Sequence, residues 1–237
     1  QQVILFEEVS KSYYTGQQAL QNISFRLEDG EMVYLRGRSG AGKSSLLKLI
    51  NLVERPSMGR IMVDDISLGG LSERGMQLYR RRIGMIFQDY RLINSSTVYD
   101  NVALPLVICG RPPEEVRKRA MASLDLVGLL EKRNYYPLPL SGGDLRRGGI
   151  ARAGVNRPRI ILADEPTGNL DHELSLEILK LFLRFNRSGV TVIVATHDSA
   201  LVSACPRRQL VLERGRLIQD IPAAAPQAAA QAGGSAS

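Results

Sequence analysis

An eight-residue stretch, GRSGAGKS at 37–44, has the residue types and spacing needed to bind phosphate groups. It matches G-x-x-x-x-G-K-[ST] and stands between a strand-like run, EMVYLR, and a helical run, KSSLLKLINLV. The glycines let successive backbone N–H groups point at one anion, and the helix N-terminus adds partial positive charge. Lys43 supplies a full charge for the β- and γ-phosphates, and the Ser44 hydroxyl can bind Mg²⁺. The residues expected to hold a nucleotide are Gly37, Arg38, Ser39, Gly40, Ala41, Gly42, Lys43, Ser44 and Ser45.

Two acids close a second apolar run, IILADE at 160–165, which is typical of a buried strand. Because ligands of an open α/β sheet bind at the carboxyl ends of its strands, we expect Asp164 to hold Mg²⁺ through water. Glu165 is then placed to polarise an attacking water molecule. His197 ends the next strand-like run, VTVIVATH, and this position predicts that it reaches a γ-phosphate. His172 has no such context and is expected to be structural.

The order of the remaining segments predicts an α/β fold. Short β-like runs fill residues 2–36, 60–66 and 83–88, and from 160 onward strands alternate with helices. Such alternation predicts a parallel-containing sheet covered by helices. Within the helical block at about 89–157, the segment 114–132 has one apolar face: Val116, Ala120, Leu124 and Val127. We therefore expect a helical subdomain inserted into an α/β core.

The composition is that of an ordinary globular chain of 237 residues, 44% hydrophobic and 23% charged. No apolar run approaches the ~18–20 residues that cross a bilayer, and no secretory leader is recognisable, so we expect a cytosolic chain. Cys109 and Cys205 lack metal-ligand spacing and are expected to be unpaired thiols. Residues 222–237, rich in Ala, Gln, Gly and Ser, predict a disordered tail. The net charge of +7 suits an anionic partner, whether nucleotide, nucleic acid or inner leaflet.

Taken in order, these motifs resemble those of ABC-type ATPases over essentially all of residues 2–220. The order is the phosphate loop, Gln88 after IGMIF, LSGG at 140–143, the acid pair, GNLD at 168–171 and His197. The resemblance implies an α/β P-loop NTPase with a RecA-like core, an antiparallel β subdomain and an inserted α-helical subdomain. It also implies Mg²⁺-dependent ATP hydrolysis by one domain spanning residues 1–221. The core would lie in residues 1–88 and 158–221, and the helical subdomain in about 89–157.

The resemblance further implies roles for single residues. Gln88 would contact Mg²⁺ and the attacking water, and Tyr13 would stack on adenine, with the neighbouring Tyr14 as the alternative. LSGG would complete the site of a second subunit in a head-to-tail homodimer with two ATP molecules between the chains. The implied groups are Glu165, His197 and Gln88 for catalysis, Ser44, Gln88 and Asp164 for Mg²⁺, and Ser141, Gly142 and Gly143 for the partner's ATP. The serine and two glycines can begin a helix whose uncapped N-terminus points at a γ-phosphate.

Within the family, the stretches FQDYRLINSSTVYDNVALPL and IARAGVNRPRIILADEPTGNLD are similar to the bacterial cell-division ATPases. That subgroup implies a peripheral protein on the cytoplasmic side of the inner membrane, at the division septum. Its integral membrane partner activates peptidoglycan hydrolases. The groove for that partner would lie near Gln88, Tyr90, Arg91 and Leu92.

Three alternative functions stay open. LADEPTGNLD is shared with lipoprotein-release and macrolide-export ATPases. A DNA-maintenance ATPase of the SMC or Rad50 class would explain a basic chain, but a long coiled coil separates the two nucleotide motifs in those proteins. Here fewer than a hundred residues without sustained heptads separate them, so no nucleic-acid partner is expected. A scaffold that binds ATP and barely hydrolyses it is opposed by Glu165.

The residues after LSGG depart from the family pattern, which continues with Gln or Glu, two glutamines and an arginine. Asp144 keeps an acid in the first helical turn, where the helix dipole favours it. Leu145 and Arg146 replace amides that could bridge a dimer interface, and Gly148 beside Gly149 should weaken the helix by ~1 kcal/mol relative to Ala. The flank therefore predicts weak dimerisation or slow turnover.

Overall fold

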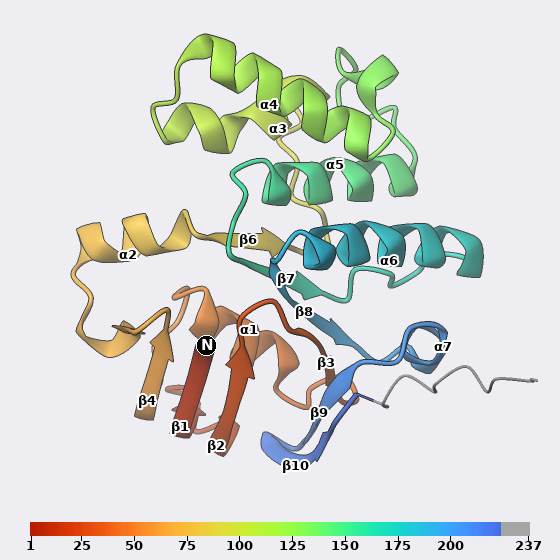
Figure 1. The fold of residues 1–237 in the computed structure, drawn as a ribbon. Coiled ribbons are helices and arrows are strands. Elements are labelled where there is room, and N and C mark those ends of the chain that lie inside the picture. The colour runs from red at the N-terminus through yellow and green to blue at the C-terminus, as the bar shows by residue number, and fades with distance from the viewer. Residues whose placement is uncertain (224–237) are drawn as a thin grey trace, which may run out of the picture.

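A six-stranded sheet lies at the centre of the computed structural model, which describes residues 1–223 (Figure 1). Its strands run parallel except for β10, which pairs antiparallel with β9 at one edge. In spatial order they are β10 (Arg216–Ile221), β9 (Arg208–Glu213), β3 (Met32–Arg36), β8 (Thr191–Thr196), β7 (Ile160–Asp164) and β6 (Ile83–Ile86). The phosphate loop follows β3 directly and leads into α1 (Lys43–Ile50).

A second, antiparallel sheet shares a core with α1 and one face of the central sheet. Its four strands lie in the order β2 (Gln18–Glu28), β1 (Gln2–Ser12), β4 (Met58–Val63) and β5 (Ile66–Ser67). Phe6 and Phe25 stack across β1 and β2 with ring centroids 4.6 Å apart. The start of β2 reaches the phosphate loop, because the Ala19 carbonyl oxygen would lie 2.8 Å from a Cβ atom at Gly42.

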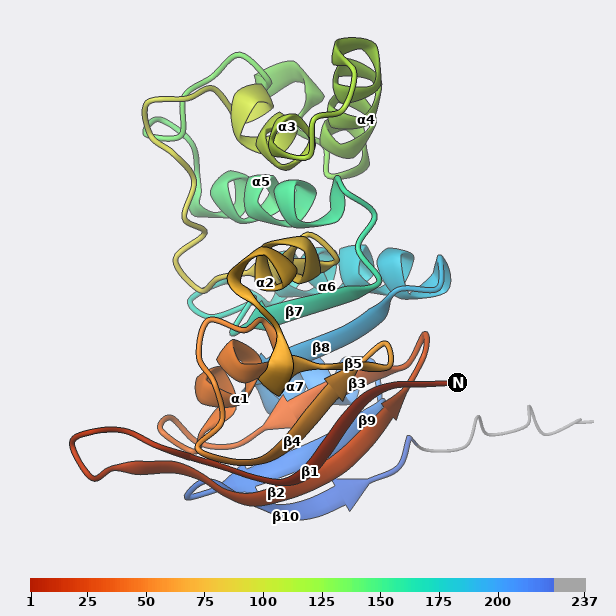
Figure 2. The same ribbon diagram turned by 90° about the vertical axis from the view of Figure 1, so that its left-hand side faces the viewer.

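Alternation along β3 shows how the central sheet separates two cores. Val33 and Leu35 face the core shared with the antiparallel sheet, whereas Met32 and Tyr34 face a core formed with helices. Those helices are α3 (Val98–Ile108), α4 (Pro113–Leu126), α5 (Gly142–Gly154), α6 (His172–Arg187) and α7 (Ser199–Ala204). In Figures 1 and 2, α3, α4 and α5 form a layer at the end of the molecule opposite the antiparallel sheet.

The α/β fold expected from the sequence is confirmed, with differences at helix ends. The helix expected over 114–132 ends at Leu126, because Gly128 adopts a φ of 72° and turns the chain. The four residues assigned to its buried face are nevertheless all buried. The sequence analysis missed α2 (Glu73–Arg80), whose short, mostly polar sequence has a single buried residue, Tyr79.

The structure bears on three further expectations. Cys109 and Cys205 are both unpaired, as expected. No helix among the described residues is both long enough and apolar enough to span a bilayer. Most of the predicted disordered tail, residues 224–237, lies outside the described part of the chain.

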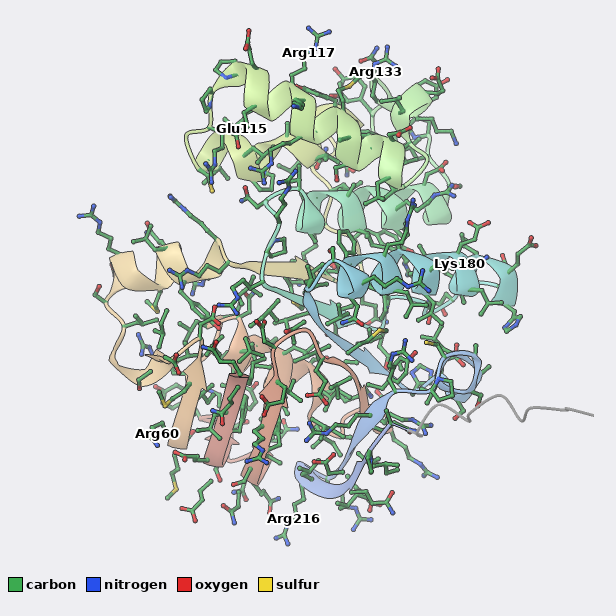
Figure 3. All side chains as sticks on the ribbon, viewed as in Figure 1. Arg60, Glu115, Arg117, Arg133, Lys180 and Arg216 are labelled. Atoms are coloured by element: carbon green, nitrogen blue, oxygen red, sulfur yellow. The ribbon has the colours of Figure 1, made fainter. Side chains whose placement is uncertain are left out.

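Positive charge is distributed over the molecule. Arg117 and Arg133 project from the helical layer, and Arg60 and Arg216 project from strands at the opposite end (Figure 3). Six more cationic side chains line a cavity of about 1000 Å³ at the place where α4, α5 and α6 end: Lys118, Arg119, Arg157, Arg159, Arg184 and Arg187. Arg119 and Arg184 donate to backbone carbonyls near those helix ends. Part of the positive excess therefore stabilises helix C-termini, which carry partial negative charge.

Candidate functional site

The phosphate loop has a shape that only glycine allows at its key positions. Gly42, which caps α1, has a φ of 110°, and a Cβ atom there would lie 2.8 Å from the Ala19 carbonyl oxygen. A Cβ atom at Gly37 would lie 2.6 Å from the Leu212 carbonyl oxygen. No side chain caps α1, so its first backbone N–H groups remain available to an anion.

Lys43 begins α1 with its side chain folded back over the loop. Its ammonium group donates to the carbonyls of Gly37 at 2.6 Å and Arg38 at 3.1 Å, and it is only 6% exposed. The same group lies 3.4 Å from Glu165 Oε1. A buried cation is thus fixed between the phosphate loop and the end of β7, where it can attract phosphate oxygens.

Glu165 is the most constrained carboxylate of the site. It follows β7 with a left-handed φ of 47°, and its amide donates to the Ala195 carbonyl. Its Oε1 atom lies 3.0 Å from Nδ1 of His197, the first residue after β8, which is 67% exposed. The two residues, which the sequence analysis placed at the ends of neighbouring strands, are therefore in direct contact.

Asp164 ends β7 beside the phosphate loop. Burial raises the pKa of its carboxyl, and the charge of Glu165 raises it further, while a hydrogen bond with Ser44 and the charge of Lys43 lower it. The net effect is a raised pKa. A cation bound near this carboxyl would lower its pKa and so favour the ionised form.

One cavity of about 490 Å³ brings most of the predicted residues together. They are Tyr13, Ser39, Gly40, Gly42, Lys43, Ser44, Ser45, Gln88, Asp164, Glu165 and His197. Gly37, Arg38 and Ala41 do not line it, although the first two hold Lys43 through their carbonyls. The sequence analysis missed six lining residues from the β1–β2 turn, the start of β2 and the β9–β10 turn: Gln17, Gln18, Ala19, Gln21, Arg214 and Gly215. They form no motif, and only their nearness to Tyr13 could have indicated the first four.

Tyr13, rather than Tyr14, belongs to this cavity. The Tyr13 hydroxyl donates to Glu54 Oε2 at 2.7 Å and lies 3.3 Å from Ser45 Oγ. Burial raises the pKa of this phenol, so it stays protonated as a donor. The Tyr14 side chain is fully exposed and lines none of the cavity.

The LSGG segment begins a helix, as predicted, but that helix is capped. The Ser141 hydroxyl accepts a hydrogen bond from the Asp144 amide at 3.1 Å at the start of α5. The expectation of an uncapped N-terminus is therefore wrong, because serine in an extended conformation satisfies one of the free amides itself. Ser141, Gly142 and Gly143 line no part of the cavity formed by the phosphate loop of their own chain.

Comparison with known proteins decides the family. Residues 20–168 match the model of the ABC transporter family. The chain belongs to this family. E. coli FtsE, a cell division ATP-binding protein, is 54% identical over 91% of this chain and 97% of its own length. The methionine import protein MetN 1 of Rhodopseudomonas palustris is 44% identical over 92% of this chain, which spans 60% of that protein.

The fold comparison agrees. The dimeric ABC transporter cassette MJ0796 superposes with a TM-score of 0.85 and 37% identity, covering 92% of this chain and 97% of that one. A second structure of MJ0796 is described as a dimer in a post-hydrolysis state bound to ADP and Pi. The present chain is thus an ABC ATPase domain that binds nucleotide, and its P-loop NTPase fold is confirmed.

In this ABC ATPase the residues after LSGG have structural partners in their own chain. Asp144 is only 3% exposed, and its carboxylate pairs with Lys132 at 2.6 Å and with Arg147 at 2.8 Å. Burial by itself raises the pKa of Asp144, but the hydrogen bonds from Lys132 and Arg147 outweigh it and bring the pKa to about 2. This ion cluster fixes the first turn of α5 against the segment that precedes it.

Arg146 corrects one expectation about this flank. Instead of facing outward toward a dimer interface, its side chain is 2% exposed and donates to the Pro166 and Gly168 carbonyls of its own chain. Gly148 and Gly149 allow a close approach: a Cβ atom would lie 3.2 Å from Leu92 at the first and 3.5 Å from the Tyr90 carbonyl oxygen at the second. The predicted weakening of dimerisation or turnover stays a prediction.

Replacing Glu165 by glutamine should remove hydrolysis while nucleotide binding persists, because the amide keeps the shape but cannot accept a proton at neutral pH. We expect the rate of ATP hydrolysis to fall by about 10²–10⁴-fold, the usual contribution of a general base. Phosphate release and fluorescent-nucleotide binding measure the two properties. The exposed Glu131→Gln should match the unmutated protein, and a Glu165→Gln protein that hydrolyses ATP normally would exclude Glu165 as the base.

The Asp144 cluster predicts a pH dependence of stability. Because the pKa of Asp144 falls from 3.8 to about 2 on folding, its contribution is complete above about pH 4 and is lost as the pH falls toward 2. The loss amounts to about 2 kcal/mol. The stability difference between the unmutated protein and Asp144→Asn, measured in urea at pH 7 and pH 3, should shrink at the lower pH. The exposed Asp125→Asn is the control, and a difference that does not change with pH would contradict the cluster's role.

Proposed function

We propose that this ABC ATPase is the ATP-hydrolysing subunit of a cell-division complex of the FtsE type. It would act as a homodimer at the cytoplasmic side of the bacterial inner membrane, at the septum, and drive an FtsX-like integral membrane partner that activates peptidoglycan hydrolysis. The single observation that carries this role is the similarity to E. coli FtsE, 54% identical over nearly the whole of both chains. No nucleic acid is involved in this proposal.

The side chains around the phosphate loop suit Mg²⁺. Ser44, Gln88 and Asp164 all line the same cavity and offer a hydroxyl, an amide oxygen and a carboxylate. Magnesium prefers such oxygen ligands and is commonly held by one or two carboxylates together with phosphate oxygens. When bound, it neutralises the charge that develops on the transferred phosphoryl group.

The chemical steps then fall to groups of this chain. The loop amides and Lys43 bind the phosphates, and Glu165 accepts a proton from the attacking water. His197, 3.0 Å from Glu165, keeps the carboxylate aimed and stands close to the same phosphates. Tyr13, held by Glu54, provides an aromatic surface for adenine.

The homodimer follows from where LSGG lies. Because Ser141, Gly142 and Gly143 line no part of their own chain's cavity, their contact with nucleotide requires a second chain. Ser141 and Gly142 are exposed, as a segment that meets another subunit must be. The dimers described for MJ0796 support the same arrangement.

A groove suited to the membrane partner lies beside β6. This cavity of about 510 Å³ is formed by residues from α2, β6, α3 and α5, including Phe87, Leu104 and Ile108. Three arginines also line it: Arg80, Arg81 and Arg152. This cavity is lined by Phe87 but not by Gln88 or residues 90–92, near which the sequence analysis expected the partner's groove. A partner helix with both apolar and acidic side chains would complement the apolar residues and the arginines that line this cavity.

A transporter subunit is the second candidate. The similarity to methionine importer MetN 1 favours a solute-transport partner, and lipoprotein release or macrolide export stays possible on the shared LADEPTGNLD segment. These functions differ from the FtsE type in the membrane protein bound, so identification of that protein distinguishes them.

Mixing two inactive variants tests the shared site. Lys43→Ala damages the phosphate loop and Ser141→Arg blocks the α5 N-terminus, so each homodimer has two defective sites. A mixed dimer has one complete site, and a 1:1 mixture should regain up to about one quarter of the unmutated activity if the sites act independently. The rate of ATP hydrolysis per chain of the unmutated protein should also rise with protein concentration. A concentration-independent rate would contradict the dimer.

Co-purification from native membranes tests the cell-division role. The tagged chain, extracted in mild detergent with ATP, should retain an FtsX-like membrane protein identified by mass spectrometry. Phe87→Asp, which places a charge in the groove, should release that protein while ATP binding in solution is unchanged. Recovery of a solute permease instead would favour the transporter function and exclude the FtsE type.

A further inference from the structure

Arg146 is a buried charge without a carboxylate partner among the described residues. Its side chain is 2% exposed, and the two acids Asp144 and Glu177 pair with the neighbouring Arg147 instead. All of its hydrogen bonds are to neutral groups: the carbonyls of Pro166 and Gly168 and the hydroxyl of Tyr90. Burying an arginine this way is costly, so its contacts need an explanation other than stability.

The first contact is with the segment that follows Gln88. The Arg146 guanidinium donates to the Tyr90 hydroxyl at 2.9 Å and lies 4.7 Å from the centre of the Tyr90 ring. Tyr90 and Arg91 adopt left-handed φ values of 59° and 49°, which cost free energy for residues other than glycine. Arg152, six residues further along α5, donates to the Tyr90 carbonyl at 3.0 Å and to the Arg91 carbonyl at 2.8 Å. Two arginines of α5 thus hold this turn in its strained conformation.

The second contact is with the loop that follows Glu165. The two carbonyls that Arg146 binds, Pro166 and Gly168, stand one and three residues after the carboxylate. The loop turns tightly, because the Gly168 amide donates to the Glu165 carbonyl at 3.1 Å. Glu165 itself has a left-handed φ, so its orientation depends on what fixes the loop on its far side.

We propose that Arg146 is a positioning residue that sets Gln88 and Glu165 relative to each other for ATP hydrolysis. Arg146 does not line the nucleotide cavity, and it acts through Tyr90 on one side and the carbonyls of Pro166 and Gly168 on the other. Because the guanidinium is planar and has five fixed donors, one side chain can satisfy both sides at once. Lysine keeps the charge but has no such fork. The inference rests on the proposed roles of Gln88 and Glu165.

Kinetics of Arg146→Met, which keeps an unbranched side chain but removes every donor, and of Arg146→Lys test the proposal. In both variants we expect kcat for ATP hydrolysis to fall by about 10-fold or more, because small displacements of catalytic groups have effects of that size. KM and nucleotide affinity should change less than about 2-fold, because the phosphate loop is untouched. The failure of lysine to rescue kcat distinguishes geometry from charge. Arg184→Met is the matched control: it removes an arginine that donates to the Leu126 carbonyl and does not line the nucleotide cavity, so kcat should stay unchanged.

Tyr90→Phe keeps the ring and the backbone turn but removes the hydroxyl that Arg146 binds. It covers the case in which the arginine variants do not fold, and it should lower kcat by about 2–5-fold without a change in melting temperature. Unchanged kcat in Tyr90→Phe overturns the proposal. Unchanged kcat in a folded Arg146→Met, or a KM that rises as much as kcat falls, does so as well. If the unmutated chain hydrolyses ATP and Glu165→Gln abolishes it, such a result rejects Arg146 alone and leaves the proposed function standing.

Discussion

Parallel pairing of β8 with both β3 and β7 is the constraint on which the site depends. The register sets Arg36 opposite Thr196 and Asp164 opposite Ala195, so three strands end at the same edge of the sheet. Asp164 is the last residue of β7, and the phosphate loop, Glu165 and His197 directly follow β3, β7 and β8. Residues separated by more than a hundred positions in sequence therefore meet without any long side chain having to reach. A shift of register by one residue would turn each of these side chains to the opposite face.

Sequence reasoning placed residues correctly where they stand at the end of a strand. The phosphate loop, Asp164, Glu165 and His197 could be predicted because each follows an apolar run whose direction in the sheet is fixed by the fold class. The capping of α5 by Ser141 was open to a local argument too, since the serine stands three residues before an amide it can bind. The sequence analysis instead assumed that a helix N-terminus that binds an anion has no side-chain cap, and for α5 this assumption was wrong.

The remaining contacts depend on tertiary structure. Nothing near Arg146 in the sequence indicates that it turns inward, because its partners lie 20, 22 and 56 residues away. Gly148 and Gly149 illustrate the same limit: local propensity treats them as weak helix formers, whereas packing uses their small size to admit residues 90–92. The cavity residues of the β1–β2 and β9–β10 turns come from hairpins whose spatial position the sequence pattern does not encode.

The length of α5 has a mechanical consequence. Its thirteen residues span about 20 Å as a single rigid helix, with the exposed LSGG end at one side and Arg152, at the rim of the β6 groove, near the other. A rotation of about 5° around its centre would move each end by about 1 Å in opposite directions, which follows from that length. Because an α-helix hardly bends over three turns, a displacement of one end would produce an almost equal displacement of the other end. The buried contact of Gly148 and Gly149 with residues 90–92 lies near the middle of α5, where such a rotation would displace the helix least.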